Sequence, residues 1–117
     1  MNKQWPLAIA AAVALAFVLK PGTSNAFECP QHFAAAQAAI DKTVADMAGM
    51  TMDPMMTAQI VAFLDRARAD LAHAMEHHAG AEGGMDHAKS IAGADTALAY
   101  AIAADIWHFR MMQAAAN

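Results

Sequence analysis

The sequence predicts an all-α fold, an antiparallel three-helix bundle that follows a cleaved N-terminal signal peptide. Three observations predict it: the chain after residue 26 is rich in Ala, Met and Leu, it has few β-branched residues, and no segment alternates polar and apolar residues as a half-buried strand does. Two short turns containing Gly or Pro divide this part into three stretches with helical spacing of apolar residues. Because turns this short make successive helices run antiparallel, we expect an up-down-up bundle.

Residues 1–26 have the three parts of a secretory signal peptide. Lys3 gives a positive start, residues 7–19 form an unbroken apolar run, and Ser24 and Ala26 are small residues at the positions before a cleavage point. The run is shorter than the ~20 residues that a membrane span needs, so we expect no stable membrane span in the mature protein. An uncleaved anchor is the alternative. The expected location of the mature protein is the bacterial periplasm.

The mature chain, residues 27–117, is predicted to be a single acidic domain of 117 − 26 = 91 residues. Cleavage removes Lys3 and Lys20, which leaves 7 − 2 = 5 basic residues against 11 acidic ones and a net charge of −6 with His neutral. This charge argues against nucleic-acid binding, which requires clustered Lys and Arg. The single cysteine, Cys29, cannot form an internal disulfide, so it is a thiol, a bridge between two copies or a metal ligand.

The helices are expected at about residues 30–48, 54–79 and 86–115. Pro30 suits the first helical position of the first helix, which Gly49 should end. Asp53 is expected to cap the second helix, which ends at Gly80. Asp86 is expected to cap the third.

Each helix is expected to bury one face, on which apolar residues recur at intervals of three and four. On the first helix this face is Phe33, Ala36, Ile40, Val44 and Met47. On the second it is Ile60, Leu64, Ala67, Leu71, Ala74 or Met75, and His78. On the third it is Ile91, Leu98, Ile102, Ile106 and Phe109.

The third helix carries two features that one buried face does not explain. Tyr100 and Trp107, one heptad apart, form a second apolar face, which favours self-association, for example a homodimer that makes a larger bundle. Asp95 falls within the predicted core face, where a buried carboxylate needs a cationic partner. It marks a polar cluster, a second subunit or a different helix phase.

The up-down-up path gathers residues remote in sequence at the two ends of the bundle. We call the start of the first helix, the end of the second and the start of the third the histidine end, and the opposite end the methionine end. The histidine end collects the cysteine and five of the six histidines: Cys29, His32, His73, His77, His78 and His87. The methionine end collects seven of the ten methionines and the last histidine: Met47, Met50, Met52, Met55, Met56, Met111, Met112 and His108. At 1.5 Å per residue the ends lie ~35 Å apart, so they are separate candidate sites.

The methionine end is a predicted Cu(I) site. Thioethers are neutral and polarisable, and they bind Cu(I) well and Zn²⁺, Ca²⁺ or Mg²⁺ hardly at all. The turn at residues 47–56 holds five methionines, so several sulfurs can converge on one ion. From the third helix, His108, Met111 and Met112 would complete the ligand shell. The alternative is that these methionines fill gaps in the core.

The histidine end is a predicted site for Cu(II) or zinc. His73 and His77 are four residues apart and share one helix face, with Asp70 as a further ligand or an orienting partner. The alternative is a row of ordinary solvated polar side chains.

A second set of ligands at the same end comes from buried positions. His78 points inward, and His32 and Cys29 come close to it if the first helix packs there. A helix N-terminus beside Cys29 favours its thiolate. Taken singly, His78 is an ordinary core histidine and His87 an ordinary polar residue in a first turn.

Copper handling in the periplasm is the function that this sorting predicts. The protein would be a carrier, buffer or tolerance factor that exchanges metal by ligand substitution, with a metal-transfer protein as its partner. One alternative is an electron carrier in which His108 and a methionine ligate b-type haem. Another is a metal-independent periplasmic chaperone or complex subunit. No enzyme is expected, because the chain lacks a nucleophile–base pair, a glycine-rich phosphate loop and a His-Glu-x-x-His motif.

Overall fold

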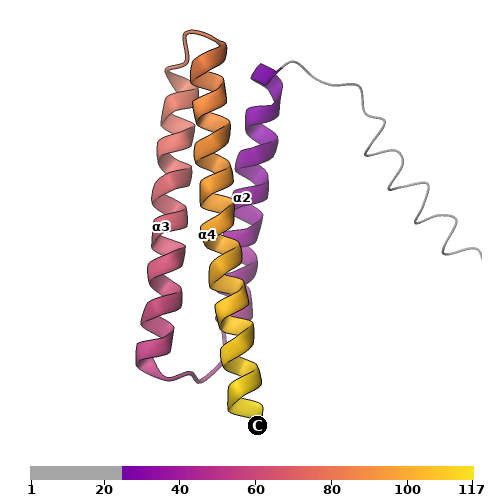
Figure 1. Cartoon of the computed structure of the whole chain (residues 1–117), viewed down its shortest axis with the longest axis vertical. Helices are drawn as coiled ribbons and strands as arrows, with labels where there is room; N and C mark the ends of the chain where they lie inside the picture. Colours follow the sequence, from indigo (N-terminus) through magenta and orange to yellow (C-terminus); the bar gives the residue numbers. More distant parts are fainter. Residues whose placement is uncertain (1–24) are drawn as a thin grey trace, which may run out of the picture.

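A computed structural model describes residues 25–117, with side chains from Glu28 onwards. This part of the chain forms three α-helices, α2 (Asn25–Met47), α3 (Pro54–Ala79) and α4 (Gly84–Ala116), and no strand (Figure 1). The predicted all-α class is confirmed for these residues. The predicted signal peptide falls outside the described residues, except for its last two, which open α2.

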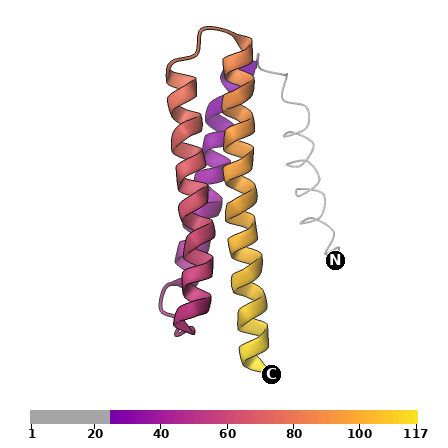
Figure 2. The same ribbon diagram turned by 60° about the vertical axis from the view of Figure 1, so that its left-hand side comes forward.

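The three helices lie side by side, and α4 is the central one. It packs along both α2 and α3, whereas α2 and α3 contact each other much less. Figures 1 and 2 show that successive helices run antiparallel, so the start of α2, the end of α3 and the start of α4 meet at the upper end. This is the histidine end, and the turn between α2 and α3 lies at the opposite, methionine end.

Each helix turns one row of buried or partly buried residues toward the bundle axis, and we call these the core rows. On α2 the row is Cys29, Phe33, Ala36, Ile40, Thr43 and Met47. On α3 it is Ile60, Leu64, Ala67, Leu71, Ala74 and His78. On α4 it is His87, Ser90, Ala94, Ala97, Ala101, Ala104 and His108. All three rows alternate steps of three and four, the spacing of helices that pack side by side along their length.

The predicted core face of α4 is wrong. Ile91 and Leu98 are only partly buried. The other three side chains are largely exposed, with exposed fractions of 46 % for Ile102, 49 % for Ile106 and 61 % for Phe109. Small residues such as Ala101 and Ala104 are fully buried instead. Because α4 lies between two helices, small side chains on its inner face let the three backbones approach closely. The prediction failed because it took large apolar side chains as the mark of burial.

Two further predictions change with the helix phase. Asp95, predicted on the core face, is exposed and shares a 2.6 Å hydrogen bond with His32 Nδ1, so a different helix phase explains it. Val44, predicted on the core face of α2, is exposed because Thr43 takes the buried position. The Thr43 hydroxyl donates to a carbonyl of its own helix at 3.1 Å and to the Ala101 carbonyl of α4 at 3.5 Å, so this buried polar group is satisfied.

Local residues explain the turn at the methionine end. The last residue of α2 is Met47, and Gly49 follows two residues later. Gly49 has a φ of 78°, a left-handed conformation that glycine adopts without strain and that stops the helix. Asp53 caps α3 as predicted, since its carboxylate accepts hydrogen bonds from the backbone N–H groups of Met55 at 2.9 Å and Met56 at 3.3 Å.

Two helices begin earlier than predicted. Because α2 begins at Asn25, Cys29 lies inside the helix rather than before it. Because α4 begins at Gly84, Asp86 is in its first turn and does not cap it. The Asp86 carboxylate instead accepts a 3.1 Å hydrogen bond from the backbone N–H of Glu82 and holds the α3–α4 loop against the helix.

Polar contacts on the outside fasten α2 to α4. One is the hydrogen bond between His32 and Asp95. In the other, Lys42 Nζ donates to the Asp105 carboxylate at 3.0 and 3.1 Å and to Asp46 of its own helix at 2.6 Å. The hydrogen bond to Asp46 and then that to Asp105 raise the pKa of Lys42 above its ordinary value. Exposed ion pairs of this kind add little to the free energy of unfolding.

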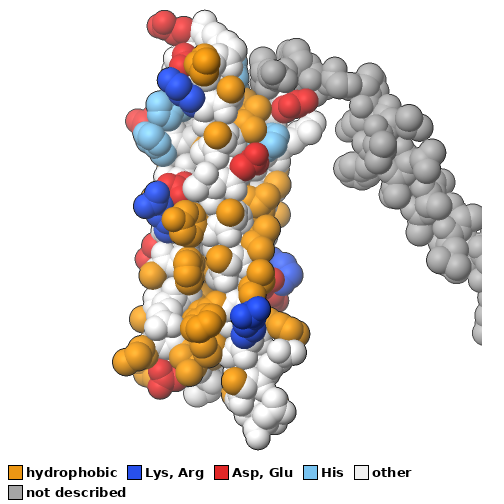
Figure 3. Space-filling view, in the orientation of Figure 1, with side chains coloured by type: hydrophobic (Ala, Val, Ile, Leu, Met, Phe, Trp, Pro, Cys, Tyr) orange, Lys and Arg blue, Asp and Glu red, His pale blue; other side chains and the backbone are white. Residues whose placement is uncertain are grey.

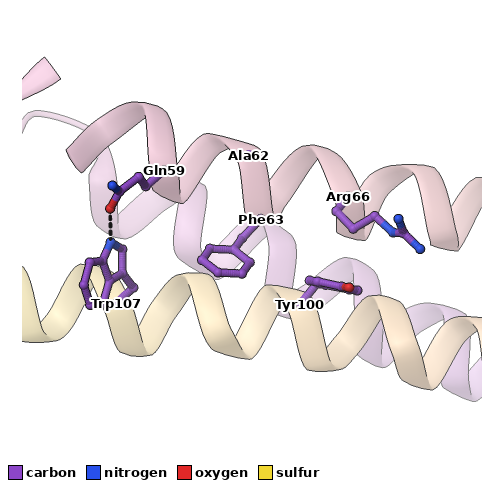
Figure 4. A pocket seen from close by; sticks show the side chains of 6 residues that line it. All are labelled: Gln59, Ala62, Phe63, Arg66, Tyr100 and Trp107. Carbon is purple, nitrogen blue, oxygen red and sulfur yellow. Dashed lines mark hydrogen bonds between the residues drawn. The ribbon is translucent and has the colours of Figure 1, made fainter. Parts of the chain in front are cut away.

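Side chains of α3 and α4 form a shallow apolar groove of about 550 Å³, shown in Figure 4. The Trp107 indole N–H donates to Gln59 Oε1 at 3.1 Å, and the Arg66 guanidinium lies 5.4 Å from the centre of the Tyr100 ring. Tyr100 and Trp107 also pack against the core. Self-association of the bundle therefore stays a prediction.

Hydrophobic side chains are visible on the outer surface in Figure 3, most of them nearer the methionine end. None of the helices within residues 25–117 is apolar over enough of its length to cross a bilayer.

Replacing Ala101 by Leu should lower the free energy of unfolding by about 1–3 kcal/mol, because the added carbons have no space in the inner face of α4. Ala99 is exposed on the same helix, so Ala99→Leu is the matched control and should change the free energy by less than about 0.5 kcal/mol. Urea unfolding followed by circular dichroism measures both. Equal stabilities for the two variants would contradict the close packing of small residues.

Candidate metal centre

The core rows end, at the histidine end, in three side chains that bind metals. Cys29 begins the row of α2, His78 ends the row of α3, and His87 begins the row of α4. One metal-binding atom from each residue lies within 4.8 Å of the other two. The steps of three and four that build the apolar core therefore also bring these donors together.

The distances within this cluster are close to those of a metal site. Cys29 Sγ lies 3.7 Å from His87 Nδ1. An ion bound to sulfur at about 2.3 Å and to nitrogen at about 2.0–2.1 Å, at a tetrahedral or trigonal angle, holds these two atoms about 3.5–3.8 Å apart. The His78 and His87 rings are 5.2 Å apart between centroids. The Cys29–His87 pair therefore has the spacing of two ligands of one ion, and a donor atom of His78 lies within 4.8 Å of both.

Burial makes the cluster unusual for a polar site. The Cys29 side chain is fully buried, and its thiol lies within hydrogen-bond distance of the His87 carbonyl oxygen, at 3.7 Å. His78 is partly buried, with its ring edge-on to Phe33 at 5.5 Å. Among the described residues, His78 Nδ1 is one of two buried side-chain nitrogen or oxygen atoms that have no hydrogen-bond partner in the protein. A buried polar atom without a partner is costly, and a bound ligand would remove that cost.

A buried hydrogen bond fixes how α3 and α4 align beside the cluster. Ser90 Oγ donates to the Ala74 carbonyl oxygen at 2.6 Å. Ala74 lies one turn before His78, and Ser90 lies one turn after His87. Gly93 keeps the helices close there, since a Cβ on it would lie 3.1 Å from the Ala74 Cβ. This contact sets His78 opposite His87.

The other predicted ligands of the histidine end lie outside the cluster. His32 is engaged with Asp95 on the α2–α4 surface. His73 and His77 are exposed on α3, with ring centroids 4.5 Å apart. Asp70, the predicted further ligand or orienting partner of this pair, instead accepts a hydrogen bond that Arg66 Nε shares between both carboxylate oxygens, at 2.9 and 3.1 Å.

The predicted methionine site divides between buried and exposed side chains. Met47 and Met52 pack against the hydrophobic core, and Met111 and Met112 are partly buried. The remaining three thioethers are exposed: Met50, Met55 and Met56. Two of the seven thioethers, those of Met47 and Met52, therefore pack in the way that the alternative of core filling predicts. The Cu(I) site at this end stays a prediction.

His108 ends the core row of α4 at the methionine end. It is only 6 % exposed, and its Nε2 is the second buried atom without a protein partner among the described residues. Asp46 lies near enough for the His108 charge to contribute to the lowered pKa of that carboxylate, although the hydrogen bond from Lys42 is the main cause.

The sequence prediction included all three residues of the cluster among its candidates but gave more weight to another pair of histidines. It emphasised His73 and His77 for their spacing and treated His78 and His87 singly as ordinary residues. The signal that identifies the cluster is positional, because each member continues a core row at the same end of the bundle.

Comparison of the chain with protein-family models, curated proteins and solved structures found no match.

Replacing Ser90 by Ala should lower the free energy of unfolding by about 1 kcal/mol, because the buried hydrogen bond from the Ser90 hydroxyl to the Ala74 carbonyl oxygen of α3 is lost. Thr96 donates to the Ala92 carbonyl of its own helix and is exposed, so Thr96→Ala is the control. Chemical denaturation of both variants gives the comparison. A Ser90→Ala variant as stable as Thr96→Ala would show that this hydrogen bond does not fix the helix alignment.

Proposed function

We propose that the protein binds a transition-metal ion at Cys29, His78 and His87 and acts as a copper carrier, buffer or tolerance factor. The observation that supports this most directly is the convergence of one thiol and two imidazoles, from three different helices, within 4.8 Å. These donors are separated in sequence by up to 58 residues.

The donor set suits copper or zinc rather than a hard cation. Thiolate and imidazole are the ligands that Cu and Zn prefer, whereas Ca²⁺ and Mg²⁺ require oxygen. For a given set of donors, divalent copper binds more tightly than zinc. Three protein ligands leave a coordination position open, and an open position allows exchange with another ligand. Exchange is what a carrier or buffer needs, in contrast to a closed structural site.

The methionine end would supply a second, Cu(I) site in this proposal. Its support is the buried His108 Nε2, which has no protein partner, at the same end of the bundle as the exposed thioethers of Met50, Met55 and Met56. Imidazole with thioethers is a soft, uncharged ligand set that favours Cu(I).

Cleavage after Ala26 and a periplasmic location belong to the proposal, and the position of Pro30 in α2 is compatible with that cleavage. Pro30 lies inside this helix and cannot donate a backbone hydrogen bond to the preceding turn. If cleavage follows Ala26, Pro30 falls among the first four helical residues, whose N–H groups have no partner within the helix in any case. The helix of a chain that starts at residue 27 then loses no hydrogen bond.

Titration of the mature protein with Co(II) tests the centre, since a cobalt–thiolate bond gives a strong near-ultraviolet charge-transfer band. We expect one equivalent to produce this band, and Cys29→Ser to abolish it. His78→Ala or His87→Ala should weaken binding by at least about tenfold, because each removes one ligand. His32→Gln is the matched control, since it changes a histidine of the same end outside the cluster.

Absence of the thiolate band in the wild-type protein would reject the centre, as would loss of affinity in His32→Gln as large as in His87→Ala. Competition with copper and zinc chelators then ranks the two ions, and we expect copper to bind more tightly. An absorption spectrum of protein purified from its native compartment separates copper from the haem alternative, which would give an intense Soret band.

A further inference from the structure

We infer that His73 and His77 form a second metal site, a capture site on the surface that delivers its ion to the buried centre. This inference rests on the proposed function of Cys29, His78 and His87. Two exposed histidines four residues apart on a helix lie about 40° apart around its axis and can chelate one ion. Their rings are in contact, with centroids 4.5 Å apart.

A polar cavity surrounds this pair. It has a volume of about 260 Å³ and is lined by His73, Glu76, His77, Gly80 and Asp86. The two carboxylates that line the cavity attract a cation by their charge, and the two imidazole nitrogens are the protein ligands. The ion would keep water in its remaining positions, which makes the site weaker than the buried one and open to solvent.

The capture site and the buried centre share neighbours on two helices. On α3, His77 lines the surface cavity, and the next residue, His78, belongs to the buried cluster. On α4, Asp86 lines the cavity, and the next residue, His87, belongs to the cluster. The two sites are therefore adjacent at the α3–α4 junction. An ion held at the surface is already beside the partly buried imidazoles of the centre.

Transfer between the sites is a ligand substitution and requires no electron donor or acceptor. The bonds from the ion to His73 and His77 break as bonds to His78, His87 and Cys29 Sγ form. The thiol proton leaves to solvent, and the ion keeps its oxidation state. A tethered ion has an effective concentration in the millimolar range, so at micromolar free metal the surface pair should raise the loading rate by about tenfold or more.

Stopped-flow loading with micromolar Co(II), followed at the thiolate band of the buried centre, tests this inference. In His73→Ala/His77→Ala the band should form about tenfold more slowly and reach its wild-type amplitude at saturation. The matched control for histidine content is Ala72→His/His73→Ala. It keeps two exposed histidines but places them five residues apart, about 140° around the helix, so it should load as slowly as the double alanine variant.

The result separates the two claims. If the wild-type protein gives no thiolate band, the buried centre fails and the delivery route fails with it. If the band forms at the wild-type rate in both variants, the buried centre stands and the capture site is rejected. Wild-type loading by the Ala72→His/His73→Ala variant alone would also reject it, because any two surface histidines would then suffice.

Discussion

The close contact of α4 with both other helices is the constraint on which the rest of the structure depends. The four central positions of its core row are alanine, so little hydrophobic area is buried per residue there, and the three backbones must approach closely to exclude water. Close approach requires a constant spacing along each helix, which the steps of three and four provide. A large side chain on this face would separate the helices, and the large apolar residues of α4 accordingly lie at the edge of the core or are exposed.

The candidate metal centre is a consequence of the same packing. The core rows continue past the last apolar layer, and their end positions hold a thiol and two imidazoles rather than aliphatic groups. The contact of Ser90 and Gly93 with Ala74, one turn below, holds α3 and α4 at the distance and alignment that the histidines need. Stability and metal binding are therefore linked here, since a shift of either helix would separate the donors.

The two ends of the core differ in the way they are closed. At the histidine end the closing residues are polar and converge on one point, and exposed histidines lie next to them on α3. At the methionine end, Met47 and Met52 cover the core and His108 is buried beside the charged network of Lys42, Asp46 and Asp105. Methionine side chains are flexible, so they can fill the irregular space where the α2–α3 turn lies beside the last part of α4.

Local patterns in the sequence are enough to place the three helices of the described residues, the Asp53 cap and the Gly49 stop, and to bring the cysteine and most histidines to one end. These follow from local propensity, capping and the short turns, which act within a few residues. Which face of α4 is buried, and which histidines meet, depends instead on how the three helices pack together. That face carries alanine where hydrophobicity favours isoleucine, and the choice depends on how closely two other helices can approach, a distance that no local pattern in the sequence encodes.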